Sequence, residues 1–225
     1  MSGLTAWAEN ARYEIVRLRR SQRIWLLVIP PIAGPIGSAV ADLYLKIPST
    51  ATALLLGLMI TGGLAGLILL DLTALAVGED LGLRAHWTYF TLPQGRTALL
   101  AGRLTVVLGL GMAAYAVGAL AIWGLGGTLI TPGDARAPIF DPAHLAWAIP
   151  AFLLFLAGVT AAAAAYSRTS AQAIVAGVLG GVVGAGVTGD LLFQGQLTLL
   201  FPVLLALGGV GALGWAFYRY PQLAA

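Results

Sequence analysis

Six apolar runs dominate the sequence, and they decide what the chain can fold into. Each run is long enough to cross the roughly 30 Å hydrocarbon layer of a bilayer as a helix. The chain is 59% hydrophobic and 9% charged, whereas a soluble domain carries about 25% charged residues. We therefore predict an all-α membrane protein with one domain over 1–225. The six predicted transmembrane helices cover about 24–41, 51–77, 98–125, 143–166, 171–188 and 197–218.

Prolines and glycines modify these spans. The first run contains Pro30, Pro31 and Pro35, which predict a kink or a break midway. Small residues recur four apart at Gly62/Gly66, Gly177/Gly181 and Gly180/Gly184, a spacing that lets membrane helices approach closely. We expect these glycines to pack helices within one subunit rather than to form a dimer interface.

Basic residues near the predicted span ends are divided unequally between the two sides. About ten lie on one side, and only Lys46 and Arg136 lie on the other. Because cytoplasmic loops carry the excess of Lys and Arg, we predict a multi-pass protein of the cell membrane with both termini in the cytoplasm. The residues on the basic side are Arg12, Arg17, Arg19, Arg20, Arg23, Arg84, Arg96, Arg103, Arg168 and Arg219.

The segment 1–23 precedes the first span and does not resemble a signal peptide, because it lacks a basic start followed by a short apolar core and a cleavage site. Apolar residues recur in it at helical spacing, while Arg12, Arg19 and Arg20 lie mostly off that stripe. This pattern predicts an amphipathic helix in the cytoplasmic interface, with arginines near anionic headgroups. Ordinary positive-inside flanking sequence is the alternative, and both can hold. The apolar stripe consists of Leu4, Trp7, Ala8, Ala11, Ile15 and Leu18.

The connection between the second and third spans predicts a short cytoplasmic helix. Glu79 and Asp80 stand where the first turn of a helix favours negative charge, and Pro93 ends the helix. Leu81, His86 or Trp87, and Phe90 fall on one face. Exposed aromatic side chains indicate a protein contact, although a helix lying on the bilayer accounts for them equally well.

Missing residues exclude several functions. The chain has no cysteine, so disulfides, thiolate zinc sites and cysteine nucleophiles are excluded. Its one lysine, Lys46, follows no glycine-rich loop, so the chain cannot build a P-loop. Any ATP that its work consumes is hydrolysed by another polypeptide. His86 and His144 fall on opposite sides of the membrane, and we predict no catalytic residue, resident metal or cofactor, and no nucleic-acid partner.

Asp71 is the one carboxylate within a predicted span. An ionisable residue inside a membrane is a functional candidate by default. We favour structural pairing with an arginine such as Arg103 or Arg23 over a role in handling a substrate or a proton.

These features together resemble the type-2 ABC transporter permeases. The likeness is carried by the acidic Glu79–Asp80 pair, by the segments 92–96 (LPQGR) and 100–103 (LAGR), and by the segment 166–173 (YSRTSAQA) before the fifth span. The six-span layout and the N-terminal helix fit as well, so the resemblance covers essentially the whole chain.

The resemblance implies a permease subunit that forms a homo- or heterodimer and sits on two ATPase subunits, which bind ATP and Mg²⁺. It implies that residues 79–92 form a coupling helix in a cleft of the ATPase, and that re-entrant outer helices lie within Gly184 to Leu200. Pro93 would set the corner, and Arg96 and Arg103 would anchor it at headgroup level. The residues implied in ATPase coupling are Glu79, Asp80, Leu81, Arg84, Trp87, Phe90, Pro93 and Arg96.

The predicted function is export of a hydrophobic or amphipathic substrate, such as a lipid, a lipid-linked sugar, a drug or a peptide, by a transport subunit that is not itself an enzyme. Two alternatives remain open. One is a membrane-embedded enzyme acting on lipid, which needs a functional Asp71 or His144. The other is a non-transporting immunity or assembly subunit that sequesters a ligand or positions partners.

Overall fold

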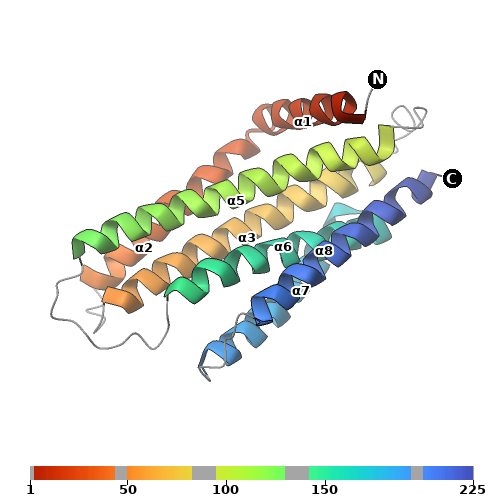
Figure 1. Cartoon of the computed structure of the whole chain (residues 1–225). Helices are drawn as coiled ribbons and strands as arrows, with labels where there is room; N and C mark the ends of the chain where they lie inside the picture. Colours follow the sequence, from red (N-terminus) through yellow and green to blue (C-terminus); the bar gives the residue numbers. More distant parts are fainter. Residues whose placement is uncertain (1–2, 44–49, 83–94, 130–141, 194–199, 225) are drawn as a thin grey trace.

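The computed structural model describes residues 3–43, 50–82, 95–129, 142–193 and 200–224. All regular structure in these ranges is helical (Figure 1). Six helical segments are long and apolar enough to cross a membrane, so the prediction of a multi-pass helical membrane protein is confirmed. The helices are α1 (Gly3–Arg20), η1 (Arg23–Val28), α2 (Ile29–Leu43), α3 (Thr50–Gly82), α5 (Gly95–Leu129), α6 (Pro142–Ser167), α7 (Ser170–Phe193), α8 (Leu200–Arg219) and η2 (Tyr220–Ala224).

Helices α3 and α6 form the centre of the bundle. Within their candidate spans 50% and 56% of the residues are buried, against 22–33% in the other four spans. Helix α3 contacts α2, α5, α6 and α7, while α6 also contacts α8. Figure 1 shows α2 and α5 on one side of this pair and α7 and α8 on the other. Both central helices are apolar around their circumference, as expected of helices buried on most sides.

Glycines allow the closest helix crossings. A Cβ atom added at Gly209 of α8 would lie 2.7 Å from the carbonyl oxygen of Leu154 on α6, and one added at Gly158 would collide with the backbone of Gly209. These two helices therefore touch backbone to backbone, which any side chain at either glycine would prevent.

The glycine pairs spaced four apart also pack within the chain, as predicted. Gly62 and Gly66 of α3 face Ile149 and Leu156 of α6. On α7, the space beside each glycine of the two pairs is occupied by a side chain of α3 or α6. These contacts pair Gly177 with Leu70 and Thr160, Gly180 with Val159, Gly181 with Leu156, and Gly184 with Phe152.

The first span changes its helical geometry at the proline-rich segment. A 3-10 helix over Arg23–Val28 gives way to α2 at Ile29, directly before Pro30. Proline is tolerated in the first turn of a helix because its missing N–H has no partner there. The change lies nearer the start of the span than predicted, and Pro35 is inside α2.

Two helices extend further than the sequence analysis expected. Helix α3 continues to Gly82, so Glu79 and Asp80 belong to its last turn and do not open a new helix. Helix α7 continues to Phe193, so the segment from Gly184 to Phe193 continues this helix and does not form a separate one. No proline interrupts either segment, and membrane helices tolerate glycine. Residues 83–94 and 194–199 lie outside the described ranges.

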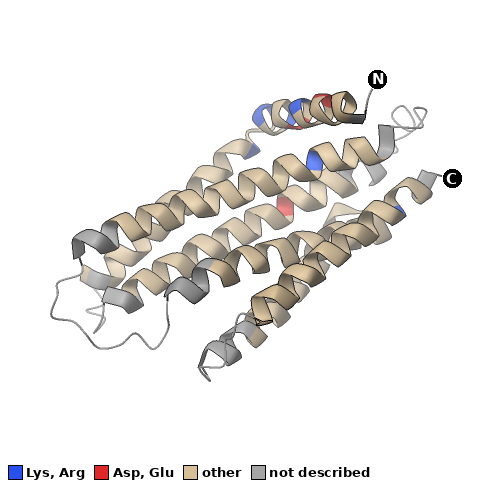
Figure 2. Cartoon of the chain, in the orientation of Figure 1, with Lys and Arg blue, Asp and Glu red and all other residues tan. Residues whose placement is uncertain are grey.

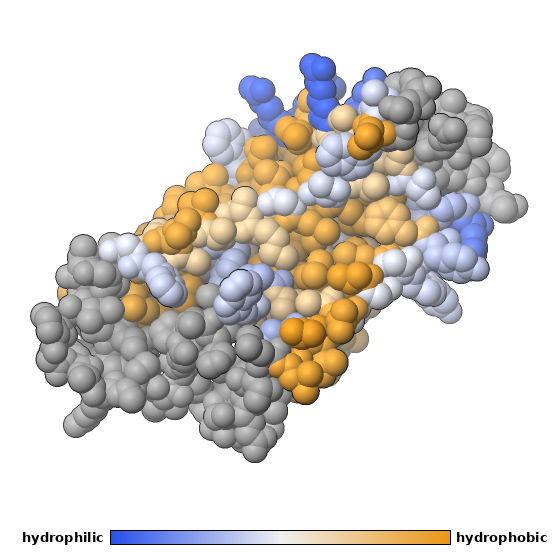
Figure 3. Space-filling view, in the orientation of Figure 1, coloured by the Kyte–Doolittle hydropathy of each residue, from blue (hydrophilic) through white to orange (hydrophobic). Residues whose placement is uncertain are grey.

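Both chain termini lie at the end of the bundle where α1 packs (Figure 1). The arginines of α1, α5 and α8 gather at this same end, as Figure 2 shows. Between the two ends the visible surface is largely apolar (Figure 3). This separation of charged and apolar surface is what a bilayer requires of a spanning bundle. We refer to this end of the bundle as the α1 end.

Candidate functional site

Helix α1 is seated on the start of α5. A Cβ atom added at Gly102 of α5 would lie 2.9 Å from the carbonyl oxygen of Trp7, from the Cβ of Asn10 and from the backbone nitrogen of Ala11. The indole Nε1 of Trp7 also donates a hydrogen bond to Oγ1 of Thr105, at 3.4 Å. The absence of a side chain at Gly102 therefore sets the distance between the two helices.

Three charged side chains meet beneath this contact. Glu14 of α1 is fully buried, and its Oε2 lies 3.6 Å from Nε of Arg103, which is 2% exposed. Its other oxygen, Oε1, accepts a hydrogen bond of 2.6 Å from Nη2 of Arg17. We call Glu14, Arg17 and Arg103 the Glu14–Arg103 cluster.

The cluster also reaches α3. Nη1 of Arg103 donates a hydrogen bond of 3.2 Å to the carbonyl oxygen of Ala76. One guanidinium thus ties α1 and α5 to the C-terminal part of α3. Because α3 ends at Gly82 and α5 begins at Gly95, the cluster joins the two helices that flank residues 83–94.

Burial makes these contacts mutually dependent. Removing charges from water costs several kcal/mol for each ion, and only close pairing offsets that cost. The carboxylate of Glu14 faces two guanidinium groups, so its loss would leave positive charge buried at the junction of three helices. The side chain of Arg103 turns inward to this carboxylate and is 2% exposed, and the predicted position of Arg103 at headgroup level stays a prediction.

The other sides of α1 face outward. Arg12, Arg19 and Arg20 are exposed, as predicted for arginines off the apolar stripe. Leu4 and Ile15 from that stripe are exposed too, at 78% and 45%. Helix α1 therefore has three sides: one packs on the bundle, one is exposed and apolar, and one is exposed and basic. That arrangement suits a helix at a membrane surface, and its location there stays a prediction.

Asp71 pairs with Arg23, one of the two arginines that the sequence analysis named. Oδ2 of Asp71 lies 3.7 Å from Nη1 of Arg23, and the side chains are 36% and 37% exposed. Arg23 opens the first candidate span, and Asp71 lies about 10 Å along α3 from Gly78, at 1.5 Å per residue. The pair therefore joins the first two spans near the α1 end.

Four of the eight predicted ATPase-coupling residues lie outside the described ranges. Arg84, Trp87, Phe90 and Pro93 fall within 83–94. Glu79, Asp80 and Leu81 are in the last turn of α3, and Arg96 is in the first turn of α5.

The turn between α6 and α7 completes this end of the bundle. Arg168 has a φ of 61°, a left-handed conformation that reverses the chain between the two helices. A Cβ atom added at Gly78 of α3 would lie 2.9 Å from the backbone nitrogen of Ser170. The segment 166–173, one of the three that carry the family resemblance, therefore packs beside the end of α3.

Comparisons of the chain with family models, with curated proteins and with solved structures find no match. Support for a function comes from the sequence pattern and from the geometry of the residues at the α1 end.

Glu14 is the site residue that sequence reasoning missed. It lies three residues after Ala11 and four before Leu18, two positions of the apolar stripe. A carboxylate between apolar positions at helical spacing is a usable signal, but it does not identify which distant arginine completes the pair.

Proposed function

We propose that the chain is the transmembrane subunit of an ABC exporter. In this proposal it works as a homo- or heterodimer, and a separate ATPase subunit hydrolyses ATP in the presence of Mg²⁺. The cargo is a hydrophobic or amphipathic molecule. Six candidate spans with both termini at one end support the proposal, as does the resemblance carried by residues 79–103 and 166–173.

The Glu14–Arg103 cluster is the observation that carries this proposal. A coupling segment must pass a displacement to rigid spans, and residues 83–94 connect directly to α3 and α5. Arg103 links these two helices through the carbonyl of Ala76, and Glu14 adds α1 to the same unit. A push on residues 83–94 would therefore move α1, α3 and α5 together.

The helices next to α3 would carry this displacement further. Gly78 contacts the α6–α7 turn at Ser170, so the end of α3 also bears on the second half of the bundle. Packed interiors transmit displacement because they resist compression. In the proposed cycle, closure of the ATPase dimer displaces residues 83–94, and the central helix α3 carries the motion to α6 and α7.

Affinity purification of the tagged protein from mild detergent, followed by mass spectrometry, tests the proposal. We expect a stoichiometric ATPase subunit to accompany the chain. Scrambling residues 83–92 should remove this subunit while α3 and α5 remain intact. Scrambling residues 131–140 is the matched control, since it alters ten residues between α5 and α6, whose adjoining ends lie opposite the α1 end, and it should leave the subunit bound.

Purification without any ATPase would overturn the proposal and favour a membrane enzyme or a sequestering subunit. If an ATPase stays bound after residues 83–92 are scrambled, only the assignment of these residues to coupling would be refuted, and the proposed function would stand.

A further inference from the structure

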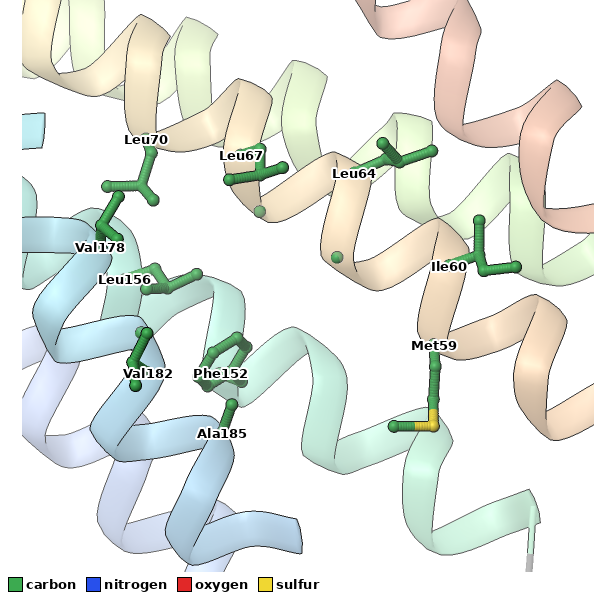
Figure 4. Close-up of a pocket in the computed structure, with 13 residues that line it drawn as sticks. Met59, Ile60, Leu64, Leu67, Leu70, Phe152, Leu156, Val178, Val182 and Ala185 are labelled. Carbon is green, nitrogen blue, oxygen red and sulfur yellow. The ribbon is translucent and has the colours of Figure 1, made fainter.

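An apolar groove opens on the outer surface of the bundle between α3, α6 and α7 (Figure 4). Its cavity volume is about 510 Å³, within the range of about 300–1,000 Å³ common for small-molecule sites. Leu156 and Phe152 of α6 lie between the walls formed by α3 and α7. The groove is open on its outer side, since Met59, Leu67 and Val182 are 54%, 59% and 65% exposed.

The α3 wall of the groove leads to a charged pair. Exposed positions on α3 recur at Met59, Gly63 and Leu67, and Asp71 follows one turn later on the same stripe. Asp71 is 36% exposed and lies beside Arg23, which is 37% exposed. Beyond its end nearer the α1 end, the apolar groove thus has one anionic and one cationic side chain.

The dimensions match one leaflet of a bilayer. From Met59 to Leu70 the groove follows α3 for about 16 Å, at 1.5 Å per residue. Half of the roughly 30 Å hydrocarbon layer is about 15 Å. The charged pair lies on the side of the groove nearer the α1 end, where headgroups of one leaflet would be found.

The charged pair is open to a further polar partner. Arg23 and Asp71 are 3.7 Å apart, and more than a third of each side chain is exposed, whereas directly hydrogen-bonded guanidinium and carboxylate groups approach to about 2.7–2.9 Å. Partly exposed charges at the edge of a bilayer need a polar cover. A headgroup with an anionic phosphate and a cationic ammonium would complement both side chains, with the phosphate accepting from Arg23 and the ammonium donating to Asp71.

We propose that this groove binds a zwitterionic phospholipid bearing a primary ammonium group, with one acyl chain in the groove and its headgroup across Arg23 and Asp71. The site does not depend on the chain acting with an ATPase. A lipid with an anionic headgroup and no ammonium fits less well, because its negative charge would face Asp71 without compensation.

Native mass spectrometry of the detergent-purified protein tests the site, with phosphatidylethanolamine and phosphatidylglycerol of identical acyl chains as probes. We expect one phosphatidylethanolamine per chain to bind about tenfold more tightly than phosphatidylglycerol, a difference corresponding to one charge-assisted contact. Asp71→Asn should bring the two lipids to within about twofold of each other. Arg23→Gln should weaken both.

A pair of glycine substitutions tests the groove itself. A Cβ atom added at Gly63, which lines the groove, meets no atom within 4 Å, and the same is true at Gly109 on the surface of α5. Gly63→Leu should fill the groove and weaken phosphatidylethanolamine binding about tenfold or more. Gly109→Leu should leave binding unchanged, because it adds the same side chain elsewhere.

Phosphatidylethanolamine with a photoreactive acyl chain provides a second readout that needs no variant. We expect its label on peptides from the groove walls of α3 and α7. Three results would overturn the proposal: equal binding of the two lipids, binding that Gly63→Leu leaves intact, or label confined to other helices. Dissociation of a lipid-free dimer by Gly63→Leu would also overturn it, by showing that a second copy of the chain covers the groove.

Discussion

The carboxylate of Glu14 on α1 lies 3.6 Å from the guanidinium of Arg103 on α5, and the two side chains are 0% and 2% exposed. Each residue lies on a different helix, far apart in the sequence. Because Arg103 also donates to the carbonyl of Ala76, this pair connects α1 to both α3 and α5. The interior of this junction is polar, although the bundle around it is apolar.

Glu14→Gln should destabilise the protein strongly. The change removes the negative charge that faces Arg17 and Arg103, and loss of one partner from a buried pair costs about 3–5 kcal/mol. For a chain of this size we expect the melting temperature in detergent to fall by about 10 °C. Glu9→Gln is the control, because Glu9 is exposed on the same helix and its change should stay within about 0.5 kcal/mol. Equal melting temperatures for the two variants would contradict a structural role for the cluster.

Gly102→Ala should separate α1 from α5 without altering any charge. The added Cβ would lie 2.9 Å from two backbone atoms of α1, which cannot rotate away, so α1 must shift. We expect faster tryptic cleavage at Arg12 and a loss of about 1–3 kcal/mol in stability, typical of overpacking. Gly109→Ala, on the same helix with no atom within 4 Å, should leave both quantities nearly unchanged. Slow cleavage at Arg12 in Gly102→Ala would refute the tight seating of α1.

The candidate spans could be predicted because membrane insertion depends on a local property. A run of about 20 apolar residues satisfies the bilayer regardless of its neighbours, and the predicted ranges agree with the observed spans to within a few residues. The end of α3 was predicted less well. Glu79 and Asp80 favour a helix start by their charge, yet an unbroken helix can carry them in its last turn.

Side-chain partners could not be predicted in the same way. Asp71 had two candidate arginines, Arg23 and Arg103, and only the packing of η1 on α3 distinguishes them. Arg103 was unavailable because Glu14 on α1 holds it. Sequence patterns describe which face of a helix is polar, whereas pairing depends on which helices are neighbours.

Gly209→Ala should loosen the crossing of α6 and α8. Its Cβ would lie 2.7 Å from the carbonyl oxygen of Leu154, so the helices must move apart and lose contact along their length. We expect a loss of about 1–3 kcal/mol, measured as a lower melting temperature in detergent. Gly211→Ala faces open space on the same helix and should be neutral or slightly stabilising, since alanine favours helix over glycine. If Gly211→Ala lowered the melting temperature as much as Gly209→Ala, the close contact of α6 and α8 at Gly209 would be refuted.

Asp71→Asn tests whether Asp71 only pairs with Arg23 or also takes part in moving the cargo. The test requires that an ATPase partner has been identified. Loss of the carboxylate removes the 3.7 Å contact with Arg23, which is partly exposed and so contributes little to stability. We expect the substrate-stimulated ATPase activity of the reconstituted complex to remain within about twofold of that of the unaltered complex. A loss of substrate stimulation with normal assembly would instead assign Asp71 to the transport pathway.

Glu79→Ala and Arg96→Glu should uncouple ATP hydrolysis from transport. These residues lie in the last turn of α3 and the first turn of α5, on either side of the proposed coupling segment. If the chain works with an ATPase as proposed, removing or reversing their charge alters that contact, while the charges of the Glu14–Arg103 cluster are unchanged, so the protein should keep its melting temperature. We expect basal ATPase activity to persist while transport into vesicles falls about tenfold, equivalent to about 1.4 kcal/mol of coupling free energy. Unchanged transport in both variants would refute the assignment of this segment to coupling.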